Sequence, residues 1–219
     1  MSIKSDKKKK YAIKEIFYTL QGEGFHAGRP AVFLRFSGCN LWSGLEKDRE
    51  TAICKFCDTD FWGTDGTLGG KYSARELAEQ ISALWPGNAR QETKFVVCTG
   101  GEPMLQMDEE IIDQLHSHGF EIAIETNGTI PVPRSIDWIC VSPKQGSEVV
   151  QKSGNELKLV HPQSGYSPED FENWDFEVFY LQPMDGPFLE KNTKACLEYC
   201  MKNPFWKLSV QTHKVLGIR

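Results

Sequence analysis

Long apolar runs are absent from this sequence of 219 residues. No uninterrupted apolar stretch approaches the roughly 20 residues that a membrane-spanning helix requires, so we expect no membrane anchor. The N-terminal residues carry charge but lack the apolar core of a secretory signal, so we also expect no export. Internal repeats are absent as well, and the only low-complexity segment is a short lysine run.

Positive charge is not in excess. Asp and Glu number 30 against 25 Lys and Arg, and the net charge of −5 argues against general binding to nucleic acid. The one basic run, Lys7 to Lys10, lies in a polar N-terminal stretch. We expect residues 1–10 to form a disordered basic tail and residues 11–219 to form a single domain.

A disulfide framework is not indicated either. The seven cysteines are odd in number, and three of them, Cys39, Cys54 and Cys57, are clustered. Because clustered thiols that are not paired fit a reducing compartment, we expect a cytoplasmic protein.

Short β-branched and apolar runs recur along the chain and predict strands. They cover 30–38, 94–101, 121–128, 138–144, 156–160, 176–183 and 207–218. Helical patterns occupy 74–85, 108–119 and 191–203. The first of these follows Ser73, which has Glu76 at the spacing of a capping box. Buried strands that alternate with helices predict a parallel α/β sheet. Because several later connections are too short for a helix, we expect a partial, open parallel β/α barrel with fewer helices than strands.

Polar and glycine-rich motifs follow these predicted strands. In a parallel sheet, the carboxyl ends of the strands meet at one edge, where ligands bind. The motifs SGCN, CTGGEP, ETNG, SPK and LQPMD all fall at such ends. We therefore expect five polar side chains to share one rim of the sheet: Glu102, Glu125, Ser142, Lys144 and Asp185.

The three clustered cysteines predict a metal centre. Their spacing is C-x14-C-x2-C, and they follow an apolar strand. Three thiolates can hold a [4Fe–4S] cluster and leave its fourth iron open to a small molecule, whereas electron-transfer clusters normally use four cysteines. Zinc also uses C-x2-C pairs but needs a fourth ligand, for which His26 is the nearest candidate.

The cysteines and the CTGGEP motif together resemble the radical S-adenosylmethionine (SAM) superfamily, although a gap of fourteen residues replaces the usual three between the first two cysteines. The segment 16–42, with CDTDFWGTDG and CTGGEP, is similar in particular to the 7-carboxy-7-deazaguanine synthase family of the 7-deazapurine (queuosine) pathway. The similarity extends to the C-terminus. It implies a single radical SAM domain over residues 11–219 and a homodimer.

The resemblance also implies roles for individual residues. Cys39, Cys54 and Cys57 would hold the cluster, and Thr59 would bind Mg²⁺. SAM would contact Phe56, Cys57, Asp58, Gly101, Ser142, Pro143, Lys144, Gln182, Pro183, Met184 and Asp185. The pterin substrate would contact Leu20, Gln21, Gly22, Glu23, Arg35, Thr99, His213 and the C-terminal Arg219.

Several of these residue types suit the implied ligands. The amide and amino groups of a pterin edge match the Gln21 amide and the Glu23 carboxylate, and Glu102 could accept a hydrogen bond from an amine of SAM. A substrate carboxylate would pair with Arg35, which is otherwise an unpaired charge within an apolar strand. Mg²⁺ takes hard oxygen ligands and keeps waters, which suits one threonine hydroxyl.

The implied activity is that of a radical SAM carbon–nitrogen lyase. SAM cleaved at the reduced cluster would provide a radical that removes hydrogen from C6 of 6-carboxy-5,6,7,8-tetrahydropterin. The ring would then contract and lose ammonia to give 7-carboxy-7-deazaguanine. A flavodoxin- or ferredoxin-type reductant is implied. Two alternatives remain: an activase that generates a glycyl radical on a partner protein, and a non-enzymatic iron–sulfur or zinc binding module.

Overall fold

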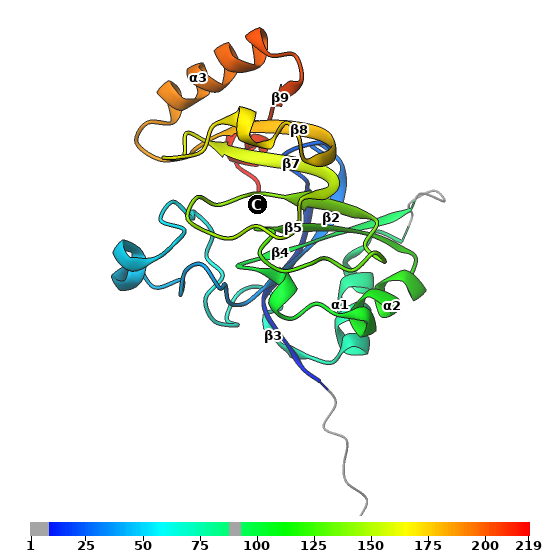
Figure 1. Ribbon diagram of the computed structural model, residues 1–219. Coiled ribbons are helices and arrows are strands. Elements are labelled where there is room, and N and C mark those ends of the chain that lie inside the picture. The colour runs from blue at the N-terminus through cyan, green and yellow to red at the C-terminus, as the bar shows by residue number, and fades with distance from the viewer. Residues whose placement is uncertain (1–8, 88–92) are drawn as a thin grey trace, which may run out of the picture.

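The computed structural model describes residues 9–87 and 93–219, which form one open sheet with helices on its outside (Figure 1). The sheet of the described residues has nine strands in the order β3-β1-β2-β4-β5-β6-β7-β8-β9. The strands are β1 (Tyr11–Leu20), β2 (Pro30–Phe36), β3 (Gly70–Tyr72), β4 (Lys94–Gly100), β5 (Phe120–Thr126), β6 (Trp138–Val141), β7 (Ser153–His161), β8 (Asp175–Pro183) and β9 (Trp206–Leu208).

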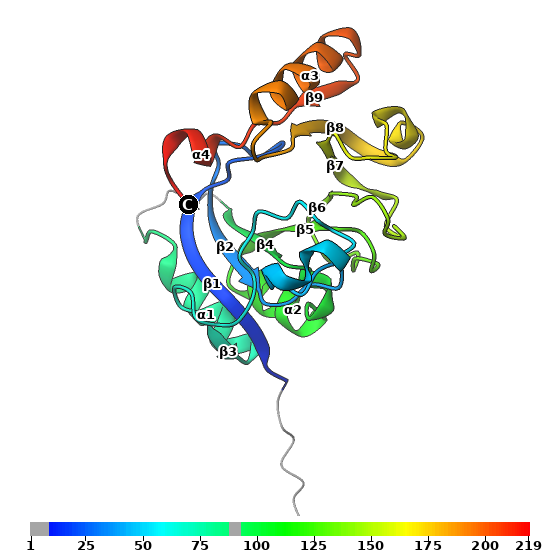
Figure 2. The ribbon, with the colours of Figure 1, turned by 90° about the vertical axis from the view of Figure 1, so that its left-hand side faces the viewer.

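The sheet confirms the predicted open, mainly parallel architecture. Neighbouring strands pair in parallel across the run β2-β4-β5-β6-β7-β8-β9. The sequence patterns did not predict β1 and β3, which extend one edge of the sheet in the antiparallel sense. Viewed from the side, the sheet curves around a central space and does not close (Figure 2).

The three predicted helices are confirmed. They are α1 (Ala74–Leu84), α2 (Glu109–Ser117) and α3 (Leu189–Lys202). Ser73 and Glu76 form the predicted capping box, in which each side chain accepts from the other residue's backbone N–H. Short 3₁₀ helices lie at Glu46–Thr51, Pro103–Leu105 and Pro168–Phe171. As predicted from two short connections, the described chain has no α-helix between β5 and β6 or between β7 and β8, and it has none between β6 and β7 either. None of the described helices is both long and apolar enough to cross a bilayer.

Successive side chains along a strand point to opposite faces of the sheet, so one face contributes to the apolar core and the other lines the inside of the curved sheet. Val32, Leu34 and Phe36 on β2 join the main apolar core beneath α1 and α2. The intervening Phe33 and Arg35 line the central pocket instead. A second core cluster, which includes Leu181, lies between β7, β8, β9 and α3.

The predicted closing strand over 207–218 is wrong in most of its length. Only Trp206–Leu208 pairs with β8, and the chain then forms the short helix α4 (Thr212–Leu216). The reason is a contact distant in sequence: the Thr212 backbone N–H and hydroxyl both donate to the carbonyl of Gly22, each at 2.9 Å. This interaction draws residues 211–219, the C-terminal segment, away from the sheet edge.

The predicted N-terminal tail lies largely outside the described residues, which begin at Lys9. Lys9 forms an ion pair with Asp108, and Lys10 pairs with Glu76 at 2.7 Å. All four side chains are substantially exposed, so these pairs contribute little to stability.

Candidate active site

A cavity of about 380 Å³ lies within the curve of the sheet. Strand ends, the loop that carries the cysteines and the C-terminal segment all contribute to its lining. Of the residues that the resemblance singled out, all except Cys39 and Pro143 line this cavity. The structure therefore brings together side chains from nearly the whole length of the chain, as expected for the carboxyl edge of a parallel sheet.

Residues 39–57, the cysteine loop, fold back on themselves. The backbone N–H groups of Ile53 and Cys54 donate to the Leu41 carbonyl at 3.1 and 3.2 Å. These bonds return Cys54 to the neighbourhood of Cys39 despite the fourteen-residue gap. All three cysteines are free thiols: Cys54 is buried, and Cys39 and Cys57 are half-buried.

The cysteine thiols are arranged unfavourably for negative charge in the absence of a cation. Burial raises the pKa of the Cys39 and Cys57 thiols, and the nearby Cys54 thiol adds to the rise. A metal centre offsets this cost because the thiolate is the form that binds metal. Free thiols at the edge of a pocket therefore suit a metal centre.

The geometry does not suit a single zinc ion. Among residues 9–87 and 93–219, no three His, Cys, Asp or Glu side chains are grouped as ligands of one ion. In a [4Fe–4S] cluster each thiolate binds a different iron, so cluster ligands lie farther apart than the ligands of one zinc. His26, the candidate fourth zinc ligand, instead packs against Phe95 and Trp138 and is absent from the pocket lining.

Gly101, the second glycine of CTGGEP, allows the start of the cysteine loop to approach the end of β4. A Cβ on Gly101 would lie 2.1 Å from the Gly38 carbonyl oxygen, so any larger residue would push the Cys39 segment away. The Glu102 backbone N–H donates to that same carbonyl at 2.9 Å.

The expectation for Glu102 is wrong. Its side chain is fully buried and does not line the pocket. Its carboxylate accepts from the Thr126 hydroxyl at 2.7 Å and from the backbone N–H groups of Asn127 and Met104 at 2.8 and 3.0 Å. Glu102 therefore joins the GGEP turn to the end of β5 and is not available to a ligand. The other four predicted rim residues do line the pocket.

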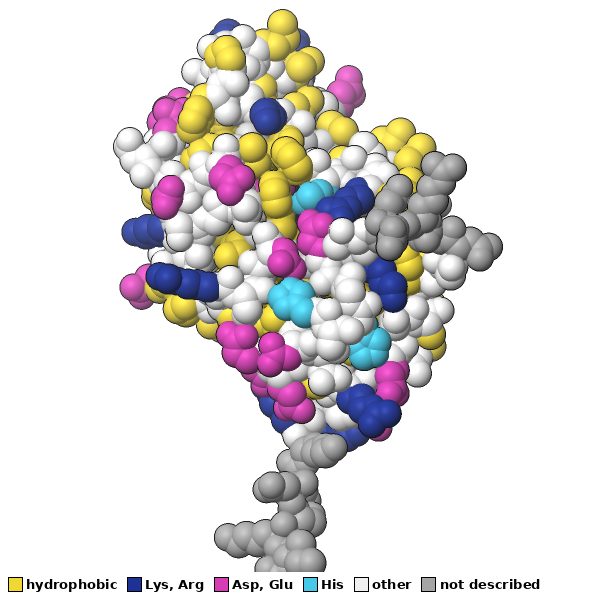
Figure 3. Space-filling model, turned by 90° about the vertical axis from the view of Figure 1, so that its right-hand side faces the viewer, with side chains coloured by type: hydrophobic (Ala, Val, Ile, Leu, Met, Phe, Trp, Pro, Cys, Tyr) yellow, Lys and Arg dark blue, Asp and Glu magenta, His cyan; other side chains and the backbone are white. Residues whose placement is uncertain are grey.

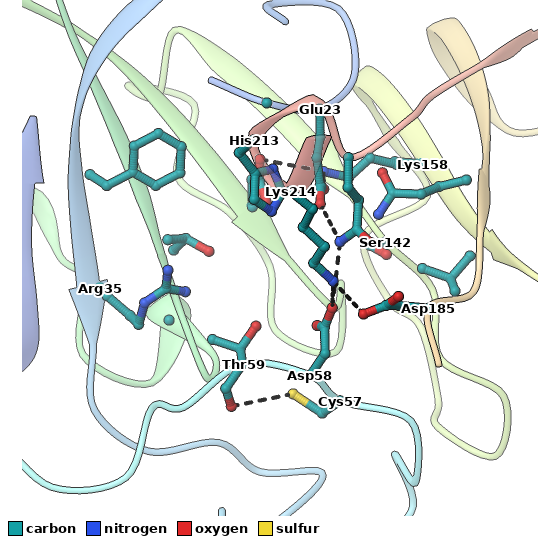
Figure 4. Close-up of a pocket in the computed structure, with 18 of the residues that line it drawn as sticks. Glu23, Arg35, Cys57, Asp58, Thr59, Ser142, Lys158, Asp185, His213 and Lys214 are labelled. Carbon is teal, nitrogen blue, oxygen red and sulfur yellow. Dashed lines mark hydrogen bonds and ion pairs between the residues drawn. The ribbon is translucent and has the colours of Figure 1, made fainter. Parts of the chain in front are cut away.

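Two lysines organise the side of the pocket next to the cysteines. The Lys144 ammonium donates to the carbonyl and hydroxyl of Ser142 at 2.7 and 2.6 Å. Burial lowers the pKa of Lys144, and the nearby thiols of the cysteine loop partly offset this decrease. Lys214 on α4 pairs with Asp58 and Asp185, at 2.6 Å each, and so joins three separate parts of the chain (Figure 4).

An ionic network around the buried Lys158 occupies the side of the pocket towards β7. Lys158, whose side chain is only 4% exposed, pairs with Glu23 at 2.5 Å and with Glu125 at 3.4 Å. The Gln21 amide donates to Glu125 at 2.8 Å, and the Gln211 amide donates to Glu23 at 2.8 Å. The pocket thus presents fixed amide and carboxylate groups that can recognise a polar heterocycle.

Arg35 is not the unpaired charge that its sequence context suggested. Its Nε donates to the Glu15 carboxylate at 2.9 Å, and Arg219 approaches the other Glu15 oxygen at 3.8 Å. Among the described contacts of Arg35 this pairing uses only Nε, which leaves the two terminal nitrogens available to an anion in the pocket. Figure 4 shows Arg35 across the pocket from Asp58 and Asp185, with Thr59 between.

Four further residues line the pocket but were not predicted from the sequence: Lys158, Lys214, Gln211 and Glu15. For Lys158 a signal existed, because a lysine in the apolar strand ELKLV is a buried charge that needs a partner. Lys214 and Gln211 had no such signal, since the expected strand placed them at a sheet edge.

Comparison with known proteins agrees with this geometry. No protein-family model matches the chain. The 7-carboxy-7-deazaguanine synthase of Bradyrhizobium diazoefficiens is 63% identical over 95% of this chain and 99% of its own length. The synthase of Burkholderia multivorans is 60% identical, again over 95% and 99%. The synthase of Synechocystis sp. is 32% identical over 95% and 94%.

A solved structure shares the fold. The crystal structure of QueE from Escherichia coli superimposes with a TM-score of 0.67 at 28% sequence identity, and the match covers 92% of this chain and 94% of that one. With relatives that are 60% identical or more along almost the entire chain and this likeness in fold, the chain belongs to the 7-carboxy-7-deazaguanine synthase family.

Proposed function

We propose that the chain is a radical SAM lyase that converts 6-carboxy-5,6,7,8-tetrahydropterin to 7-carboxy-7-deazaguanine and ammonia. The observation that carries the proposal is one cavity with cysteine thiols at one end and a cation, fixed amides and carboxylates at the other. Ammonia accounts for the whole difference in composition between substrate and product, so the reaction needs no net oxidant. The two alternatives from the sequence, an activase and a binding module, explain less of this pocket.

The cluster and SAM, when bound, supply the radical chemistry, and the protein supplies position and charge. Cys39, Cys54 and Cys57 hold the cluster. SAM fits in the adjoining space, between the thiols and the substrate. This space is enclosed by the Ser142–Lys144 pair and by the bridge that Lys214 forms between Asp58 and Asp185.

The substrate occupies the opposite side of the cavity. Glu23 and Gln21 face the amino and amide edge of the pterin, and their own hydrogen bonds hold them in place before the ligand arrives. Arg35 receives the substrate carboxylate. The C-terminal segment lies across this side of the pocket and limits the entry of water, which favours a small substrate over a glycyl residue of a partner protein.

Magnesium, the reductant, the oligomeric state and the compartment belong to the same proposal. Thr59 offers one hard oxygen to Mg²⁺ where SAM and substrate meet. A flavodoxin- or ferredoxin-type protein supplies the electron in the cytoplasm. A homodimer is supported by exposed apolar side chains on α3 and α4, since Met201 is 76% and Val215 84% exposed. Figure 3 shows hydrophobic side chains gathered towards the upper end of one face, where α3 and β9 lie.

The test is anaerobic reconstitution followed by assay. The protein should show the visible absorption of an iron–sulfur cluster, and with SAM and a reductant it should release 7-carboxy-7-deazaguanine from the carboxylated tetrahydropterin. Cys54→Ala should lose the cluster and SAM cleavage while its circular dichroism stays native. A zinc-loaded, colourless parent protein, or a parent whose cluster forms without any turnover, would contradict the proposal.

A further inference from the structure

The fourteen residues between Cys39 and Cys54 form an ordered unit. The 3₁₀ helix Glu46–Thr51 lies at its centre. The Ser43 hydroxyl donates to Asp48 at 2.7 Å and accepts from the Leu45 backbone N–H at 3.2 Å, which fixes the start of that helix. A mere spacer between two ligands would need no such internal bonding.

Arg49 connects this unit to the segment that carries the last two cysteines. One terminal nitrogen of its guanidinium, Nη1, donates to the carbonyls of Lys55 and Cys57 at 3.0 and 3.1 Å. Its Nε donates to the Glu46 carboxylate at 2.8 Å. Glu46 is 77% exposed, so the ion pair alone contributes little, and the bonds to the two carbonyls are the informative contacts.

The guanidinium is itself held by an aromatic ring. It lies 4.0 Å from the ring centroid of Trp42. Trp42 is buried, donates its Nε1–H to the Leu45 carbonyl at 3.2 Å and packs edge-on against the buried Phe61. Arg49 thus connects the backbone at Cys57 to the buried side chain of Trp42.

We infer that Arg49 is a positioning residue, which sets the backbone of residues 55–57 so that the thiols are arranged before the cluster is present. The inference rests on the proposed function only in naming the cluster as the occupant. Lysine cannot replace Arg49, because its single ammonium nitrogen lacks the separate Nε and Nη1 donors that reach the carboxylate and the two carbonyls. The same contacts orient Phe56 and Asp58, which line the pocket.

The first experiment uses iron-free, reduced protein and measures alkylation of each cysteine by mass spectrometry. Arg49→Met and Arg49→Lys should raise the alkylation rate of Cys57 about tenfold, since the loss of a hydrogen bond from a charged group makes local opening easier by that order. Cys98, buried in the core away from the loop, reports global opening and should not change.

The second experiment measures iron release from the reconstituted protein to a chelator, with the electron paramagnetic resonance spectrum of the reduced cluster. Both Arg49 variants should lose iron about tenfold faster and show an altered spectrum. Arg75→Lys is the matched control. Its Nε pairs with Glu79 at 2.8 Å, as Arg49 does with Glu46, but on the exposed surface of α1.

Parental rates for Cys57 alkylation and iron release in both variants would overturn the inference. Faster alkylation of Cys98 together with Cys57 would also overturn it, because the effect would then be general destabilisation. The alkylation result does not depend on turnover. A parent protein that fails to convert the tetrahydropterin would contradict the proposed function, and the role of Arg49 would still be decided.

Discussion

Gly22 and His213, both of which line the pocket, pack against each other although they lie near opposite ends of the chain. A Cβ on Gly22 would come within 2.3 Å of the His213 Nδ1 and 2.8 Å of its Cβ. The contact involves the root of the histidine side chain, so a rotation of the imidazole would not relieve it. Glycine at position 22 is what lets the C-terminal segment settle over the cavity.

Gly22→Ala should therefore displace His213 and loosen α4. Overpacking of this kind costs about 1–3 kcal/mol, and we expect KM for the tetrahydropterin to rise about tenfold. Steady-state kinetics measure the change. Gly87→Ala is the control, because a Cβ there meets nothing within 4 Å. An unchanged KM in the Gly22 variant would show that the C-terminal segment does not shape the substrate site.

Lys158→Met should destabilise the fold. Lys158 is buried and its partners Glu23 and Glu125 are partly buried, and removing one partner of a buried pair typically costs about 3–5 kcal/mol. Urea unfolding measures the loss. Lys194→Met, which removes an exposed pair with Glu198, should change little. If the Lys158 variant unfolds at the same urea concentration as the parent, the network is not a stabilising element.

The stability contributed by Glu23 should depend on pH in a defined direction. Burial raises the pKa of the Glu23 carboxyl, but the Lys158 ammonium and the hydrogen bonds from Lys158 and Gln211 lower it more, so the net shift is downward. Because the pKa of Glu23 is lower in the folded state, its ionised carboxylate stabilises the fold at any pH above the unfolded-state pKa of about 4.3. This stabilisation is lost as the pH falls from there through the folded-state pKa of about 2. The free energy of unfolding of the parent and of Glu23→Gln should thus differ by a constant amount near neutrality and converge in acid. A difference that widens in acid would contradict the pairing.

Arg35→Lys should reduce recognition of the substrate carboxylate. Lysine keeps the charge but lacks the fork that serves Glu15 and a ligand together, so kcat/KM should fall about 10- to 100-fold. The measurement compares the carboxylated tetrahydropterin with one that lacks the carboxylate. The parent should prefer the former, and the variant should not. A variant that keeps the preference would make Arg35 only a partner of Glu15.

Thr59→Ala should weaken the response to Mg²⁺ without changing SAM affinity. Its hydroxyl is the single hard oxygen that we assign to the metal, while SAM relies on other side chains. Titration of activity with Mg²⁺ and calorimetric titration with SAM separate the two effects. The same Mg²⁺ dependence in parent and variant would place the metal elsewhere.

Part of the site was predictable from local patterns and one general rule, and most of its other lining residues were indicated by the family resemblance. The cysteine spacing and the motifs after the strands are contiguous in sequence, and parallel strands bring such motifs to one edge. The rule failed for Glu102, which follows β4 but turns away from the cavity to accept three hydrogen bonds. Position at a strand end does not decide which way a side chain faces.

The first strand was missed for a related reason. Within YAIKEIFYTL, Lys14 and Glu15 interrupt the apolar pattern that indicates a strand. Both charges are matched by distant partners: Lys14 by Asp60 and Asp65, and Glu15 by Arg35. Only the folded chain reveals those pairs, so the local pattern was misleading there.

Sequence alone indicated the cluster of three cysteines and the open parallel sheet, because hydrophobic periodicity and short motifs are local properties of the chain, and the resemblance to a known family indicated most of the side chains that line the cavity. Tertiary structure decided the contacts between distant segments: Lys158 with Glu23, Lys214 with Asp58 and Asp185, and Arg49 with the carbonyls beside Cys57. Such pairings depend on how the sheet curves and where the C-terminal segment crosses it. No local pattern records either, since both follow from the packing of the whole chain.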